Sequence, residues 1–358
     1  MALDFNQGLL AFLRRTLDSP GLAFREPPKE IALGTEARIV KFTLRSAPRE
    51  FAHPLVLRIS RDRDYPIHPG LEHAVQNTVF EQGFPAPRVL ASSINGAELG
   101  HPFTIMTLVD SRPPFFESII QRQIHRLRRV SRWNSQRPVA LNHRGLHIRT
   151  LAWLHNLDGR SLGKMFEAHK VPIDRLTEPT RFVQTQRMIE EWGLDSLRPL
   201  IQWLETNDPV DVKTSRSICH GDLHDGNLMI ADGRVMGVID WGEAGLRPPE
   251  SDLGLLCGYR RCVEPLSTSS YDQQKFNEDL FAEYKLYRSM DEKMASYFEA
   301  ELLISFMASV AVQINRHADG REPPGNPLLD NPATVPRLAR RLKFFVGKDV
   351  FIPEHPNL

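Results

Sequence analysis

Asp222, Asn227 and Asp240 place two carboxylates and an amide within 19 residues of the chain. Amide and carboxylate oxygens are hard ligands that suit Mg²⁺, which takes few protein ligands and completes its coordination with water and substrate phosphates. A carboxylate next to such a metal can orient a hydroxyl group and accept its proton, as phosphoryl transfer requires. The three residues therefore predict a Mg²⁺-assisted phosphoryl-transfer site.

The stretch between Asn227 and Asp240 is expected to form a short β-hairpin. Apolar runs lie on both sides of Asp232-Gly233, and Asp-Gly between such runs is a strong signal for a tight turn. If these two are the turn residues, Asn227 lies opposite Val238. Asp240 then points to the same face as Asn227, at the diagonal cross-strand position. We therefore expect both side chains at the open end of the hairpin, with the Asp222 loop leading into it.

Three motifs follow one another within 35 residues: His220-Gly-Asp-Leu-His-Asp-Gly-Asn227, Val238-Ile-Asp-Trp-Gly242 and Glu250-Ser-Asp-Leu-Gly254. In type, order and spacing they resemble the aminoglycoside phosphotransferase family of protein-kinase-like enzymes. The resemblance implies a bilobal α+β fold and transfer of the γ-phosphoryl group of ATP or GTP, with Mg²⁺, to a hydroxyl of a small molecule. The acceptor stays open between an aminoglycoside-type antibiotic and another hydroxylated metabolite, because acceptor pockets vary within one fold.

The resemblance also implies a role for each motif residue. Asp222 is the catalytic base, and Asn227 and Asp240 are the metal ligands. Asp252 is a structural acid that braces the catalytic loop, and His220 supports the same loop by packing and hydrogen bonding.

A weaker resemblance upstream implies a nucleotide-binding region. The strand around Arg58 is similar to the one that carries the phosphate-binding base, and the helix around Glu72 to the one that carries its acidic partner. Many members have Lys at the first position, and the planar fork of Arg differs from the point charge of Lys. Arg58 as a surface residue, Glu72 as a solvated acid and Gly34 as a plain turn residue stay open. The implied nucleotide-binding residues are Arg58, Glu72, Gly34, Thr35, Met106 and Leu108.

The elements that position these residues change in type along the chain. Short strands with one inserted helix give way, near Asp110, to a mostly helical pattern. We expect an N-terminal nucleotide-binding lobe over residues 1–109, with an antiparallel sheet and one helix. A C-terminal catalytic and substrate-binding lobe over residues 110–358 would be mostly helical and contain the catalytic loop and the hairpin. The expected strands cover residues 39–44, 55–59, 88–91 and 103–109, and the expected helices 1–17, 71–82 and 302–314.

The composition is that of an ordinary soluble protein. Of the 358 residues 41% are hydrophobic and 25% charged, and the formal net charge of +1 gives no field that selects nucleic acid or a membrane. The helix expected at 302–314 is a core helix, too short to span a bilayer. Three cysteines cannot form a disulfide framework for this length, which indicates a reducing compartment. We expect a cytoplasmic protein that binds a small-molecule acceptor and neither nucleic acid nor membrane; its oligomeric state stays open.

Two charged regions give opposite hints about the acceptor. Residues 111–150 contain nine arginines and one acid, whereas residues 250–301 contain eleven acids and six bases. A basic arm beside the site favours an anionic or neutral acceptor, and acid-lined helices favour a polycationic aminoglycoside. The basic stretch as a plain solvated surface also stays open.

Other classes of protein share parts of this pattern. A catalytically inactive, nucleotide-binding relative is one alternative, although such proteins usually lose the base or a metal ligand, and all three residues are present. Gly221-Asp-Leu-His224 resembles one element of the metallophosphoesterases, but the Asp-x-His and Gly-Asn-His elements of a two-metal site do not occur in the chain. A zinc site on His220 and His224 lacks a third ligand.

Overall fold

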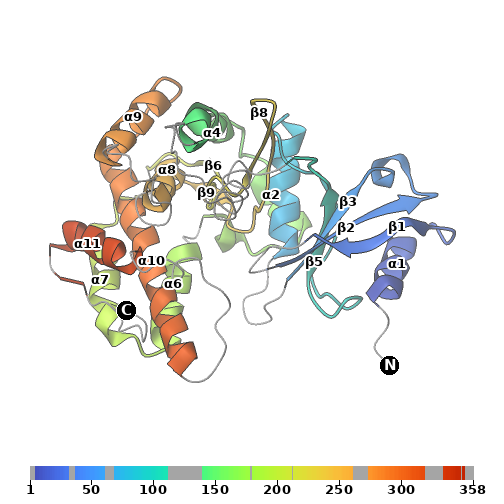
Figure 1. Ribbon diagram of the computed structural model, residues 1–358, viewed down its shortest axis with the longest axis horizontal. Helices are drawn as coiled ribbons and strands as arrows, with labels where there is room; N and C mark the ends of the chain where they lie inside the picture. Colours follow the sequence, from blue (N-terminus) through green and yellow to red (C-terminus); the bar gives the residue numbers. More distant parts are fainter. Residues whose placement is uncertain are drawn as a thin grey trace, which may run out of the picture. The chain divides into compact units, whose positions relative to one another are not determined.

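The computed structural model describes residues 5–31, 37–60, 68–111, 139–177, 180–211, 213–260, 273–318, 334–347 and 349–350. The chain forms two compact units, each built from separate segments (Figure 1). The N-terminal unit comprises Met1–Pro113, Leu157–Leu176 and Asn227–Ala244, and the C-terminal unit comprises Pro114–Asn156, Thr177–Gly226 and Gly245–Leu358. The hairpin thus groups by its contacts with the N-terminal unit, and the lobe boundary at Asp110 stays a prediction.

The N-terminal unit is built on an antiparallel five-stranded sheet with the strand order β1-β2-β3-β5-β4, which confirms the expected sheet. Three α-helices and two 3₁₀ turns complete the described part of this segment set. The elements are α1 (Phe5–Thr16), β1 (Ala23–Glu30), β2 (Ala37–Arg45), η1 (Arg49–Phe51), β3 (Leu55–Ser60), α2 (Pro69–Glu81), β4 (Val89–Ser93), β5 (Phe103–Thr107), α5 (Leu162–Ala168) and η2 (Ile173–Leu176).

Alternation along β3 separates the two faces of this sheet. Leu55 and Leu57 join the apolar cluster that includes Leu9 and Leu13 of α1. The side chain of Arg58, on the other face, reaches α2. Because successive strand residues point to opposite faces, α1 and α2 cover opposite faces of the sheet. The helix expected at 71–82 therefore delivers its acidic residue to the face that carries Arg58.

The edge strand β1 was not expected from the sequence. It contains Pro27 and Pro28, and its register with β2 shifts between Glu26 and Lys29. Proline lacks the N–H that a sheet ladder needs, so it is confined to edge strands and bulges. Because these prolines interrupt the residue pattern typical of a strand, the sequence did not predict β1.

The hairpin consists of β7 (Leu228–Ala231) and β8 (Arg234–Val238). Ala231 pairs with Arg234, so Asp232 and Gly233 form the expected two-residue turn. The register then shifts, and Leu228 pairs with Val238. The expected pairing of Asn227 with Val238 is wrong, because a bulge inserts one extra residue into β8.

The bulge lies at a crowded position. A Cβ on Gly237 would lie 2.7 Å from a methyl group of Val109, so any larger residue there would require Val109 to move. The next residue, Val238, donates its N–H to the carbonyl of Pro85 at 2.7 Å. Packing of β8 against this neighbouring backbone decides the register, and no sequence pattern within the hairpin reveals it.

The described part of the C-terminal unit is mostly helical, as expected, with one two-stranded sheet. The long helix α10 packs against α6, α7, α8 and α11 (Figure 1). The elements are α4 (Val139–His155), α6 (Thr180–Glu191), η3 (Asp195–Leu197), α7 (Arg198–Asn207), β6 (Ser217–Cys219), β9 (Gly245–Arg247), α8 (Glu250–Gly258), α9 (Gln273–Lys285), α10 (Glu292–Ala318) and α11 (Thr334–Val346).

Helix α10 is longer than the stretch 302–314 that the sequence analysis assigned to a core helix. By length and apolar composition it could cross a membrane, but 72% of that apolar window is buried within the protein. Gly254 of α8 lets the two helices approach closely, since a Cβ there would lie 2.4 Å from the carbonyl oxygen of Ala295. These features are those of the central helix of a globular unit.

Candidate functional site

Arg58 links two acidic residues in the N-terminal unit. Its Nη1 donates to Glu72 Oε1, and its Nη2 donates to Asp240 Oδ1 at 2.6 Å. The hydroxyl of Thr104 donates to the second Glu72 oxygen at 2.9 Å. Arg58 is only 7% exposed and Glu72 only 1%. The structure therefore contradicts the surface-residue interpretations of both residues, and it brings Arg58 together with one of the expected metal ligands.

Burial dominates the electrostatics of Glu72. Loss of hydration raises the pKa of Glu72 above its ordinary value, and the positive charge of Arg58 offsets this only in part. The negative charge of Asp240 adds to the increase in pKa. Arg58 thus bonds to two carboxylates at once, and the planar guanidinium group of Arg suits that arrangement better than the ammonium point charge of Lys.

Asp240 lies two residues beyond the end of β8, in a strained backbone conformation. Its φ is +68°, in the left-handed region that residues other than glycine seldom adopt. Trp241 anchors the following turn: its side chain is fully buried, and its Nε1 donates to the carbonyl of Val238 at 2.9 Å. Asp240 therefore turns the chain at a position where a regular strand was expected. Strain of this kind persists where the surroundings fix it, and often at functional sites.

The oxygen donors expected to bind a metal both lie at the open end of the hairpin, Asn227 just before β7 and Asp240 just beyond β8. Asn227 is 7% exposed, and its backbone carbonyl accepts the N–H of Ile239 at 3.0 Å. The Asp240 side chain is 38% exposed. An amide and an accessible carboxylate form a donor set that fits Mg²⁺, which needs few protein ligands. Their convergence on one ion stays a prediction.

Asp222 lies on the loop that follows β6, in the C-terminal unit. Its Oδ1 accepts a hydrogen bond from the Tyr259 hydroxyl at 3.2 Å and lies 3.9 Å from Arg181 Nη2. Its Oδ2 lies 3.7 Å from His224 Nε2. With 24% of its side chain exposed, the carboxylate is accessible but surrounded by donors on the same unit. Such an environment suits a carboxylate that must be held in one orientation.

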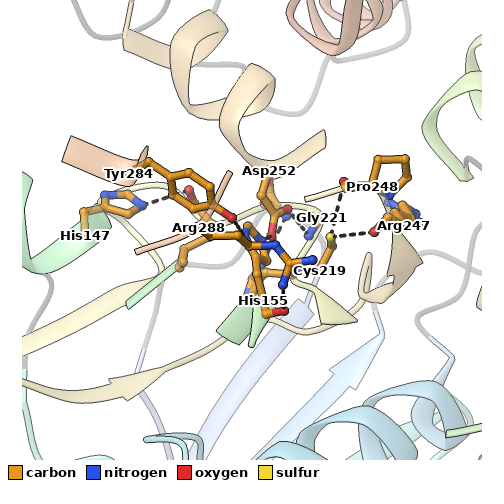
Figure 2. Close-up of polar contacts among 12 residues, drawn as sticks. His147, His155, Cys219, Gly221, Arg247, Pro248, Asp252, Tyr284 and Arg288 are labelled. Carbon is orange, nitrogen blue, oxygen red and sulfur yellow. Dashed lines mark hydrogen bonds and ion pairs between the residues drawn. The ribbon is translucent and has the colours of Figure 1, made fainter. Parts of the chain in front are cut away.

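The loop that carries Asp222 is held through its backbone (Figure 2). The Asp252 carboxylate accepts the N–H groups of His220 and Gly221, each at 2.8 Å, and faces His155 Nε2 at 3.1 Å. Burial raises the pKa of Asp252, but the hydrogen bonds from His155 and the His220 amide outweigh it, so the pKa lies below its ordinary value. His220 Nδ1 in turn accepts the N–H of Asp222 at 3.2 Å. These contacts hold the backbone of the loop, and the roles expected of Asp252 and His220 in supporting catalysis stay predictions.

A second buried contact holds the middle of the loop. Asp225 Oδ1 lies 2.5 Å from Arg260 Nη2 and 3.1 Å from His147 Nδ1. The other ring nitrogen of His147 faces the carbonyl of Leu223 at 3.2 Å. Burial raises the pKa of Asp225, but the bond from His147 and the charge of Arg260 outweigh it and hold the pKa below its ordinary value. The loop is therefore anchored at both its first and its middle residues.

Sequence reasoning missed several of these contacts. Tyr259 and Arg260 lie five and six residues beyond the third motif, at the end of α8. Their closeness to this motif was the one signal in the sequence that pointed to them. Arg181 and His147 come from helices α6 and α4 and carried no signal of their own. Long-range contacts of this kind depend on how helices pack, which the sequence pattern does not specify.

The positions of the other expected nucleotide-binding residues say less about their roles. Met106 lies at the end of β5 and is 8% exposed, and Leu108 donates its N–H to the carbonyl of Pro54 at 3.0 Å. Gly34 and Thr35 lie outside the described residues, as does most of the basic stretch, residues 112–138. The nucleotide-binding roles of these residues stay predictions.

Among the described residues, His155, Cys219 and Asp252 form a cluster with ligand atoms within 4.8 Å of one another. All three are buried, and each already bonds within the protein: His155 Nδ1 to the Tyr284 hydroxyl at 2.7 Å, Cys219 to the carbonyl of Arg247 at 3.4 Å, and Asp252 to the loop (Figure 2). The cluster therefore serves as a hydrogen-bonded support of the loop, and these contacts leave no reason to assign it a metal.

The match with a family model decides the affiliation of the chain. The model of the phosphotransferase enzyme family matches residues 28–292, about three quarters of the sequence. The chain belongs to this family. The match extends over all three motifs up to the start of α10.

Curated relatives match the chain over part of its length. Acyl-CoA dehydrogenase family member 11 of Rattus norvegicus is 26% identical over 235 residues, or 63% of this chain and 28% of that protein. The Homo sapiens protein of the same name is 23% identical over 208 residues, or 56% and 25%. The chain spans about a quarter of the length of these curated relatives.

Two solved structures show the fold. A Ralstonia eutropha JMP134 protein designated an aminoglycoside phosphotransferase is 17% identical, with a TM-score of 0.59 over 96% of this chain and 98% of that chain. A thermostable mutant of aminoglycoside phosphotransferase APH(4)-Ia, in complex with ADP and hygromycin B, is 12% identical, with a TM-score of 0.52 over 95% and 98%. The predicted kinase-like α+β fold is confirmed.

Proposed function

We propose that this protein transfers the γ-phosphoryl group of ATP or GTP to a hydroxyl of a small molecule. Membership of the phosphotransferase family supports the reaction class. The observation that carries the proposal is the Arg58 guanidinium, which bonds to both Glu72 and Asp240. A buried cation held next to a candidate metal ligand is an arrangement that enzymes use to bind a nucleoside triphosphate.

Each residue of this chain would have a separate task. Asp222 orients the acceptor hydroxyl and takes its proton, while its donors on the same unit keep the carboxylate in place. Asn227 and Asp240 would hold Mg²⁺, and the ion would supply charge neutralisation on the β and γ phosphates. Arg58 positions the phosphates, and Glu72 positions Arg58. The four residues between Asp222 and Asn227 span at most about 17 Å, so the chain itself ties the base to the first metal ligand.

The experiment that tests this proposal combines nucleotide binding with a turnover screen. Binding of ATP and GTP is measured by calorimetry with and without Mg²⁺, and ADP or GDP formation is followed over aminoglycosides, macrolides, sugars, amino alcohols and hydroxy acids. We expect Mg²⁺-dependent binding and turnover with at least one acceptor class. Asp240→Ala should lose the Mg²⁺ dependence of binding. Nucleotide binding without turnover on any class would favour the inactive relative, and Mg²⁺-independent binding would contradict the metal assignment.

A further inference from the structure

Helix α8 ends in a π-helical turn that carries Tyr259 and Arg260. Consecutive side chains of an α-helix point about 100° apart, yet both of these reach the loop of the proposed base. The Tyr259 hydroxyl donates to Asp222 Oδ1 at 3.2 Å, and Arg260 Nη2 lies 2.5 Å from Asp225 Oδ1. Turns of π-helix are rare and frequent at functional sites, and this one brings two adjacent side chains to one loop.

The ring of Tyr259 is held by other rings. Its centroid lies 4.8 Å from that of His224, with the two planes tilted by 37°. On another side it meets Phe306 of α10 edge to face, at 5.2 Å and 78°. Aromatic pairs at these separations attract one another. These contacts place the ring independently of its hydroxyl, so the hydroxyl meets Asp222 from a fixed position.

His224, the second neighbour of Asp222, also has a defined orientation. Its Nδ1 accepts the N–H of Gly226 at 2.9 Å, so Nε2 carries the proton of the neutral ring. This N–H faces Asp222 Oδ2 at 3.7 Å, and Arg181 Nη2 lies 3.9 Å from Oδ1. Both distances exceed that of a hydrogen bond. Of these three side chains, Tyr259 is therefore the one that bonds directly to the carboxylate.

We infer that Tyr259 is a positioning residue for Asp222, whose hydroxyl fixes the rotation of the carboxylate about the bond between Cβ and Cγ. The terminal torsion of an aspartate has a broad distribution, so a directed hydrogen bond can select one rotation. A general base must present its oxygen to the hydroxyl within hydrogen-bond reach, and small displacements cost large factors in rate. The effect on turnover rests on the proposed function, whereas the orientation of the carboxylate does not.

Arg260, the next residue, has a different task. Arg260 and Asp225 are only 3% and 7% exposed, so this pair lies in the interior and holds the loop itself. Tyr259 instead meets a carboxylate whose side chain is 24% exposed. Loss of the Arg260 charge leaves a buried acid without one of its partners and destabilises the fold. Water can replace the Tyr259 hydroxyl beside an accessible carboxylate, but it does not come from a fixed direction.

Tyr259→Phe removes the hydroxyl and keeps the ring. With ATP, Mg²⁺ and an acceptor found in the turnover screen, kcat should fall about tenfold or more, as loss of a hydrogen bond to a charged group implies. The KM of the acceptor, the affinity for ATP and the urea midpoint should stay unchanged. Arg260→Gln should instead lower the urea midpoint. Tyr287→Phe, at a tyrosine that is 46% exposed, is the matched control and should change none of these quantities.

Replacing Tyr259 by 4-aminophenylalanine tests whether the donor itself matters. The amine returns an N–H donor to the same position on the ring, so most of the lost kcat should be recovered. A purely structural role of the tyrosine predicts no such recovery. Unchanged kcat in Tyr259→Phe, or no recovery with the amine, overturns the inference.

Crystal structures of the wild type and of Tyr259→Phe, each with Mg²⁺ and a non-hydrolysable ATP analogue, test the orientation without turnover. We expect the Asp222 carboxylate to rotate in the variant while the backbone of residues 220–227 stays in place. The same carboxylate orientation in both proteins, or a displaced backbone, overturns the positioning role. Absence of ADP formation by the wild type with every acceptor contradicts the proposed function, and the two structures then decide the role of Tyr259 by themselves.

Discussion

The two units hold the carboxylates of the proposed site by different means. In the N-terminal unit, Asp240 is held by a side chain, the Arg58 guanidinium, and keeps 38% of its own side chain exposed. In the C-terminal unit, the Asp222 loop is held through backbone N–H groups that the buried Asp252 accepts. A side-chain bridge can rearrange when phosphate and metal arrive, whereas a backbone anchor fixes the loop before any ligand binds. The N-terminal unit thus holds its carboxylate with a charge that can rearrange, whereas the C-terminal unit holds its loop in a fixed geometry.

The largest effect is expected on activity. Asp222→Asn removes the proton acceptor but leaves the backbone anchor of the loop intact, so turnover with a confirmed acceptor should fall by about 10²–10⁴-fold. Nucleotide affinity and the free energy of unfolding should stay unchanged. Steady-state kinetics, calorimetry and urea unfolding measure the three quantities. Asp232→Asn, the same change in the turn of the hairpin, is the control. A loss of unfolding free energy in Asp222→Asn would show instead that the fold of the loop depends on this side chain.

The next effect is on stability, where the backbone anchor is broken. Asp252→Asn places an amide next to backbone donors and leaves His155 and the loop N–H groups with poorer partners. Breaking a buried charged contact of this kind costs about 3–5 kcal/mol of unfolding free energy. Urea unfolding measures it, and Asp195→Asn, at an acid whose side chain is 76% exposed, should have no measurable effect. A loss of activity without a loss of stability would argue against an anchoring role.

The side-chain bridge gives a smaller and graded effect. Arg58→Met leaves the buried Glu72 without its cation, so the pKa of Glu72 should rise further. Because a carboxyl with a raised pKa binds its proton more tightly in the folded state, its contribution to stability is lost as the pH rises from its ordinary pKa through the raised one. The variant should therefore lose more stability than wild type between mildly acidic and neutral pH. Arg58→Lys should lie between the two, and identical pH profiles for all three proteins would contradict the assignment.

How much the sequence predicts depends on the range of each interaction. The antiparallel sheet, the helix that carries Glu72 and the Asp232-Gly233 turn follow from local patterns, and the structure has all of them. The register beyond the turn does not, because the backbone of Pro85 and the side chain of Val109 act on β8 from elsewhere in the fold. For the same reason motif spacing indicated the residues of the loop but not Arg181, which reaches it from a helix about 40 residues upstream.

The smallest expected effect concerns the helix that carries Glu72. The neighbouring His73 stacks on His169 with ring centroids 4.0 Å apart, and its Nδ1 lies 3.3 Å from the Ser92 hydroxyl. Burial, with the nearby charges of His169 and Arg88, lowers the pKa of His73 to about 4. A histidine with a depressed pKa stabilises the fold above its ordinary pKa of 6.5, and this contribution is lost as the pH falls from 6.5 towards 4.

His73→Gln should therefore flatten, but not abolish, the fall in stability over this pH range, since burial also lowers the pKa of His169. Urea unfolding between pH 4 and 7 measures the slope, with His53→Gln, at an exposed histidine, as the control. An unchanged slope would show that His73 does not contribute to the pH dependence of stability. A flattened slope with unchanged nucleotide affinity at neutral pH would show that α2 holds Glu72 in place without this histidine. In that case the Arg58 bridge alone would provide the charge that can rearrange in the N-terminal unit.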